Sequence, residues 1–138
     1  MCRWLLGSGV AISKVHRGDG SPDDIWMTTS LSLSHVPFQG PVDVLVDSNT
    51  FSSAEALAYH LRVRGRVRIF GEKTNGGGDH CTPIQLTRNV LGILPCAVVD
   101  DAVTTTNWEG VGVPIDVADT GANALEIVLS TPARTSEQ

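Results

Sequence analysis

Two adjacent serines, Ser52 and Ser53, follow an apolar β-branched segment and begin a stretch of helical period. The segment 42–47 reads VDVLVD, and Glu55 falls within the first turn of the predicted helix. Unpaired amides and the positive end of the helix dipole converge at such a junction. A serine there can act as a nucleophile, because the amides of the following residues can bind the oxyanion that forms on the attacked carbonyl group. Serine is also a preferred helix N-cap, so the local pattern leaves both roles open.

A carboxylate in the segment 107–114, NWEGVGVP, is a second group with catalytic potential. Glu109 lies between Trp108 and Gly110, where a partly desolvated carboxylate can orient an imidazole, as the third member of a catalytic triad does. An ordinary loop carboxylate has the same local pattern, so this alternative also stays open.

The four histidines do not identify a general base. His60 follows Ser52 by eight residues, which places it about 12 Å along a helix axis, too far for a hydrogen bond. His80 is the best-placed local candidate because it adjoins a glycine-rich loop. His16 and His35 have no defined geometry, and an isolated histidine is more commonly a surface residue.

The loop 73–80, KTNGGGDH, contains three consecutive glycines. Glycines allow the backbone to approach a substrate chain or another loop closely, and we expect Gly76 and Gly77 to lie along a bound substrate. Neither GxGxxG nor GxxxxGK[ST] is present, so a nucleotide phosphate site is not indicated.

No metal or other cofactor is expected. A zinc site from His80, Cys81 and Cys96 is disfavoured, because two adjacent ligands followed by one distant cysteine is not a usual spacing. The odd number of cysteines, without a CxxC pair, argues against a disulfide scaffold. Cys81 and Cys96 are expected to be small buried thiols.

The elements around these residues predict an α/β fold. A strand at 42–47, a helix from Ser53 to just before Gly65 and a strand at 67–71 form a βαβ unit, with parallel strands and a right-handed crossover. The first of these strands is expected to be buried on both faces. The remaining expected elements are a helix end at 4–6, a strand at 10–15, extended segments at 24–29 and 31–36, short strands at 82–86, 90–94 and 96–99, an ordered loop at 104–114 and an amphipathic helix at 122–129.

The length of 138 residues suits one domain, assigned to 1–131, with a polar tail at 132–138 expected to fray. The net charge of −5 disfavours a nucleic-acid partner. No apolar run approaches the ~20 residues needed to cross a bilayer, so no membrane partner is expected. Free thiols and the lack of a recognisable leader favour the cytoplasm. A solvated surface is favoured over an anion site for the alternating arginines Arg62, Arg64, Arg66 and Arg68.

Four blocks in this order resemble the tail-specific (carboxyl-terminal-processing) serine protease family, in its tricorn-core and interphotoreceptor-retinoid-binding-protein-like branch. The blocks are residues 40–46, 50–59, 65–67 with 71–77, and 108–117. The resemblance implies a crotonase-like and Clp-protease-like β-β-α spiral core, of which this chain would be the carboxyl-terminal part.

The resemblance also implies site roles. Ser52 would be the nucleophile, the amide of Ser53 would contribute to the oxyanion hole, and Glu109 would orient a histidine base. In the branch with a Ser–Lys dyad, the lysine position falls on Gly77, and Lys73 lies too early in the loop to replace it. In the histidine branch, the base and a second oxyanion amide come from upstream, and neither is identified here.

The implied activity is that of a serine endopeptidase acting on a polypeptide substrate. We expect this chain alone to have little activity, because a serine without its base loses most of its nucleophilic activation. One alternative is a non-catalytic module that binds an extended peptide or an apolar ligand on the same fold. Another is a hydrolase that uses His80 as a local base. A homo-oligomer is compatible with the sequence.

Overall fold

The computed structural model describes residues 2–29, 36–119 and 123–132, which form helices and two sheets. The elements in chain order are α1 (Arg3–Leu6), β1 (Ala11–Arg17), β2 (Asp24–Met27), β3 (Asp43–Val46), α2 (Ser53–Val63), β4 (Arg68–Gly71), β5 (His80–Thr87), β6 (Val90–Asp101), β7 (Val117–Ala118) and α3 (Ala124–Ser130). The predicted mixture of helices and strands is confirmed. Most of the predicted extended segment 31–36, and the predicted tail beyond Pro132, lie outside the described residues.

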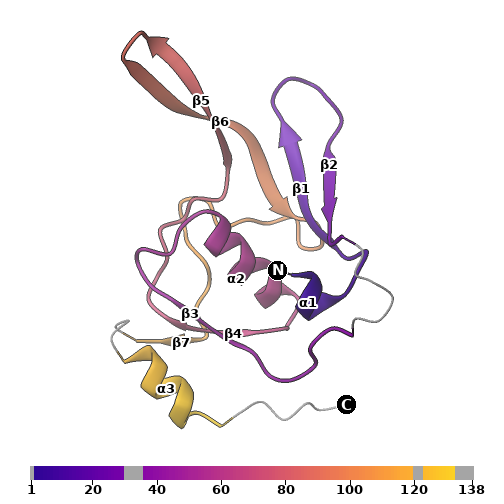
Figure 1. Cartoon of the computed structure of the whole chain (residues 1–138), viewed down its shortest axis with the longest axis vertical. Helices are drawn as coiled ribbons and strands as arrows, with labels where there is room; N and C mark the ends of the chain where they lie inside the picture. Colours follow the sequence, from indigo (N-terminus) through magenta and orange to yellow (C-terminus); the bar gives the residue numbers. More distant parts are fainter. Residues whose placement is uncertain (1, 30–35, 120–122, 133–138) are drawn as a thin grey trace.

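The strand–helix–strand unit is present as predicted. β3 and β4 pair in parallel, from Asp43 opposite Arg68 to Val46 opposite Gly71, and β7 pairs with the other edge of β4. α2 and α3 lie on opposite sides of this three-stranded sheet (Figure 1). The buried core packs between α2 and the sheet and consists of Val46, Ala58, Tyr59, Leu61, Val67, Ile69, Trp108 and Val113.

The predicted burial of β3 on both faces is wrong. Val46 is buried, whereas the side chain of Leu45, on the opposite face, is 46% exposed. Among the described residues, the helix on that side of the sheet is α3, which has seven residues. Two helical turns cover only part of a strand face, so the apolar pattern of the strand overstated its burial.

A second, antiparallel sheet has the strand order β2-β1-β6-β5. The structure corrects the three short strands predicted after residue 80: β5 is followed by one continuous strand, β6, that runs through Pro95. The pairing skips Cys96, so a bulge accommodates the missing amide of Pro95. The β5–β6 hairpin projects from the rest of the molecule (Figure 1). Cys81 and Cys96 lie on this hairpin and are exposed, contrary to the predicted burial.

The alternating arginines do not form a freely solvated surface. Arg62 binds Asp116, Arg64 binds Asp101 and the carbonyl of Ala11, Arg66 binds the carbonyls of Leu5 and Phe38, and Arg68 binds Asp43. Arg62, Arg64 and Arg66 therefore tie the βαβ unit to segments outside it, whereas Arg68 links its two strands, β4 and β3. Arg64 connects the end of α2 to the antiparallel sheet.

We expect Gly71→Ala to lower the free energy of unfolding by about 2–4 kcal/mol. Gly71 has φ 124°, and an added Cβ would lie 1.9 Å from the carbonyl oxygen of Val46 in the neighbouring strand. Gly18→Ala is the matched control, since nothing lies within 4 Å of the added Cβ. Urea unfolding of both variants measures the difference. Equal stability would contradict the close β3–β4 approach.

Candidate active site

Ser52 occupies the sharp turn that leads into α2, where it has φ 55° and ψ −118°. A positive φ is unfavourable for a residue with a Cβ and costs on the order of 1–3 kcal/mol. The side chain is exposed, and the backbone amide donates a hydrogen bond to Oε2 of Glu55 at 2.8 Å. A hydroxyl is thus presented to solvent at the N-terminus of a helix.

Glu55 is fully buried and organises this turn. Its carboxylate accepts hydrogen bonds from the amides of Ser52 at 2.8 Å, Gly76 at 2.6 Å and Gly77 at 2.9 Å. Burial opposes ionisation of Glu55, but the Thr74 hydroxyl and the three amides together outweigh burial and lower its pKa. One buried charge therefore holds the glycine loop against the start of α2.

The glycine loop lies close to the residues on either side of it. A Cβ on Gly77 would lie 2.2 Å from the ring of Phe51, and a Cβ on Gly78 would lie 3.1 Å from the amide nitrogen of Glu109. Gly76 accepts a hydrogen bond from the amide of Gly110 at 2.8 Å. A side chain at residue 77 would therefore require the exposed ring of Phe51 to move.

Glu109 lies on the far side of the same loop. Its Oε2 accepts hydrogen bonds from the amide of Gly78 at 2.6 Å and the amide of Asp79 at 3.0 Å. Burial, followed by the nearby charge of Glu109, raises the pKa of Asp79. In the part of the chain that the structure describes, no imidazole is hydrogen-bonded to Glu109.

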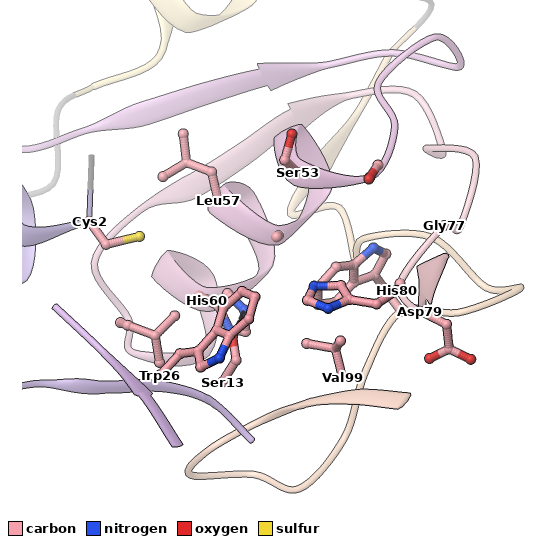
Figure 2. Close-up of a pocket in the computed structure, with 15 residues that line it drawn as sticks. Cys2, Ser13, Trp26, Ser53, Leu57, His60, Gly77, Asp79, His80 and Val99 are labelled. Carbon is pink, nitrogen blue, oxygen red and sulfur yellow. Dashed lines mark hydrogen bonds between the residues drawn. The ribbon is translucent and has the colours of Figure 1, made fainter. Parts of the chain in front are cut away.

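A cavity of about 470 Å³ opens between α2 and the antiparallel sheet (Figure 2). The structure places Ser52, Ser53, Gly77 and His80 around this cavity, whereas Gly76 and Glu109 lie behind the loop and do not line it. Figure 2 shows Ser53 on the helix and Gly77, Asp79 and His80 on the loop side of the cavity. The remaining wall is mainly apolar and includes Ile12, Trp26, Leu57, Val99 and Trp108.

His60 was not singled out as a functional residue from the sequence, yet it is 2% exposed and makes two side-chain contacts. Its Nδ1 lies 2.8 Å from Oδ2 of Asp101, and its Nε2 lies 2.9 Å from Oγ of Ser13. Burial lowers the pKa of His60 and outweighs the opposing effect of Asp101. The only signal in the sequence was that His60 follows Leu57 by three residues, on the apolar side of α2.

Within residues 2–29, 36–119 and 123–132, no cluster of three histidine, cysteine or acidic side chains could hold a metal ion. In the same residues, no helix has the length and apolar character needed to span a membrane.

The model of peptidase family S41 matches residues 5–118 of this chain. The structure is similar to that of the photosystem II D1 C-terminal processing protease, with TM-score 0.63, 24% identity and coverage of 87% of this chain and 30% of that one. It is similar to a lipoprotein from Streptococcus agalactiae, with TM-score 0.70, 16% identity and coverage of 94% and 46%. It is also similar to mature CPAF, with TM-score 0.58, 18% identity and coverage of 71% and 19%. This chain therefore spans less than half the length of each of these proteins.

We expect Glu55→Gln to lower the free energy of unfolding at neutral pH by about 1–3 kcal/mol. A glutamine has one acceptor oxygen, so at least one of the three amides would lose its partner. The exposed helical residue Glu126 provides the control, and Glu126→Gln should change stability by less than about 0.5 kcal/mol. Chemical denaturation measures both effects, and indistinguishable variants would contradict the role of Glu55.

The stability difference between wild type and Glu55→Gln should depend on pH. Because the pKa of Glu55 is lower in the folded chain than in the unfolded chain, its stabilisation is complete above the ordinary carboxyl range. The stabilisation is lost as pH falls through the lowered folded-state pKa. The denaturation curves of wild type and Glu55→Gln, recorded from pH 7 downward, should therefore approach each other as the pH falls. A constant difference at every pH would show that Glu55 is not a stabilising carboxylate.

Proposed function

This chain belongs to peptidase family S41, and from that membership we propose that it carries the nucleophile of a serine endopeptidase. Ser52 is that nucleophile. The observation that carries the proposal is its placement: an exposed hydroxyl at positive φ, at a helix N-terminus, on the wall of a cavity. The substrate is a polypeptide, whose scissile carbonyl carbon Ser52 Oγ attacks.

The amide of Ser53 stabilises the oxyanion in this proposal. Ser53 is the first residue of α2, and the amides of a first helical turn have no acceptor inside the helix. The helix dipole adds positive potential at the same point. Gly77 contacts the bound substrate in this proposal. The amides of Gly76 and Gly77 both donate to Glu55, so Gly76 helps to hold Gly77 in position.

The general base for Ser52 is a histidine that Glu109 orients. Among the described residues, no imidazole or amine is hydrogen-bonded to the Ser52 hydroxyl. We therefore expect the 138-residue chain alone to have little peptidase activity. His80 is a second candidate for the base, because it lines the same cavity as Ser52.

The proposed architecture of the whole catalytic core is a crotonase-like and Clp-like β-β-α spiral, to which residues 1–131 contribute the carboxyl-terminal part. The alternative function, a module that binds a peptide or an apolar ligand without cleaving it, is supported by the apolar wall and the size of the cavity. The cytoplasmic location and a homo-oligomeric state stay predictions.

Added imidazole tests the proposed nucleophile. A diffusible base replaces part of the 10²–10⁴-fold contribution of a positioned one. We therefore expect imidazole to raise the cleavage rate of an internally quenched peptide about tenfold in wild type and not in Ser52→Ala. Ser48→Ala is the control, because Ser48 lies in the exposed turn outside the cavity.

Equal rates for Ser52→Ala and Ser48→Ala would exclude Ser52 as the nucleophile. In the absence of imidazole, loss of residual cleavage in His80→Ala would identify His80 as the base. Unchanged cleavage in that variant would exclude His80.

A further inference from the structure

A second serine in the same cavity already has the partners that Ser52 lacks. Ser13 Oγ lies 2.9 Å from Nε2 of His60, and Nδ1 of His60 lies 2.8 Å from Oδ2 of Asp101. The three residues come from β1, α2 and the end of β6, and they are 4%, 2% and 0% exposed. We propose that Ser13, His60 and Asp101 form a second acyl-accepting site, in which Ser13 is the nucleophile and His60 the base. This inference goes beyond the proposed peptidase function and does not depend on Ser52.

The surroundings of Asp101 fix the direction of both hydrogen bonds. Burial opposes the charge of Asp101, but hydrogen bonds from Arg64, His60 and the amides of Val103 and Thr104 outweigh burial and lower its pKa. Asp101 is therefore a carboxylate and accepts the proton on Nδ1 of His60. Nε2 is left with a lone pair that accepts the Ser13 hydroxyl proton. This is the protonation pattern of a serine–histidine–aspartate triad.

Two features of the backbone support this arrangement, one at Ser13 and one at His60. A register shift in the β1–β2 pairing separates Ala11 from Ser13, and bulges of this kind redirect a side chain. His60 lies in the last turns of α2, where the negative end of the helix dipole stabilises the imidazolium formed when His60 takes a proton.

Both Ser13 and His60 line the cavity. Figure 2 shows Ser13, His60 and Trp26 together at one end of the cavity, away from Gly77 and Asp79 at the other. The apolar wall of the cavity includes Ile12, Trp26, Leu57 and Val99, so the substrate class that fits is an ester of a small apolar carboxylic acid.

The reaction is an acyl transfer with balanced proton movement. Ser13 Oγ adds to the ester carbonyl carbon while its proton moves to Nε2 of His60. The tetrahedral intermediate expels the alcohol oxygen, which takes that proton from His60, and an ester of Ser13 remains. Water attacks this ester with the same base, releases the carboxylic acid and restores the Ser13 hydroxyl.

A fluorophosphonate probe tests the site without knowledge of the natural substrate. Ser13 Oγ forms a bond to phosphorus, fluoride leaves, and His60 takes the hydroxyl proton. After digestion, mass spectrometry locates the label on the peptide that contains either Ser13 or Ser52. The chains compared are wild type, Ser52→Ala, Ser13→Ala, the double variant and Ser48→Ala as control.

We expect Ser52→Ala to keep the label on Ser13 and the double variant to lose labelling at least about 100-fold. The rate of p-nitrophenyl butyrate hydrolysis should change in the same way, with activity kept in Ser52→Ala and lost in the double variant. Absence of label on Ser13 in the folded Ser52→Ala chain would overturn the proposal. Label on Ser52 in Ser13→Ala reports separately on the proposed peptidase nucleophile, so the two proposals can fail independently.

His60→Gln tests the base, because glutamine keeps a polar side chain but cannot take the proton. We expect at least about 100-fold slower labelling of Ser13, with circular dichroism confirming that the variant is folded. Unchanged labelling would overturn the role of His60. If this variant does not fold, the location of the label in Ser52→Ala decides the proposal.

Discussion

The buried carboxylate of Glu55 is the constraint on which the site depends. It accepts hydrogen bonds from the amide that precedes α2 and from two amides of the glycine loop, which is 21 or more residues further along the chain. A carboxylate in the interior is stable only when several donors surround it, so removing any of these contacts weakens the others. The turn at Ser52 and the position of the glycine loop are therefore set together rather than independently.

A second buried charge, Asp101, joins the antiparallel sheet to α2. Its carboxylate binds His60 and Arg64, both on or directly after α2, while its own strand belongs to the antiparallel sheet. Arg64 also binds the carbonyl of Ala11 in β1. The cavity lies between these layers, so the network that closes one end of the cavity also fixes the distance between its walls.

Local features of the sequence predicted local structure well. The β-branched run, the turn residues and the helical spacing after Ser53 were enough to predict the βαβ unit and the junction at Ser52. The contacts of His60 could not be predicted, because Ser13 and Asp101 are 47 and 41 residues away in the chain. The continuity of β6 through Pro95 likewise depends on a bulge in its pairing with β5. The residues of β6 alone do not indicate this bulge, because it depends on the partner strand. The separate partners of the four arginines are also contacts between distant segments.

The conformation of Ser52 bears on a question that the sequence left open, namely whether this serine is a nucleophile or a helix N-cap. A helix N-cap normally adopts extended backbone angles, which cost nothing and already direct its hydroxyl toward the first turn. Ser52 instead has φ 55° and is exposed. Capping alone does not require this strain, since the Glu55 carboxylate already binds the Ser52 amide. Ser52 and Glu55 form a capping box, so capping and the proposed nucleophilic role fall on the same residue, and the strain held there by surrounding contacts is the feature that capping alone leaves unexplained.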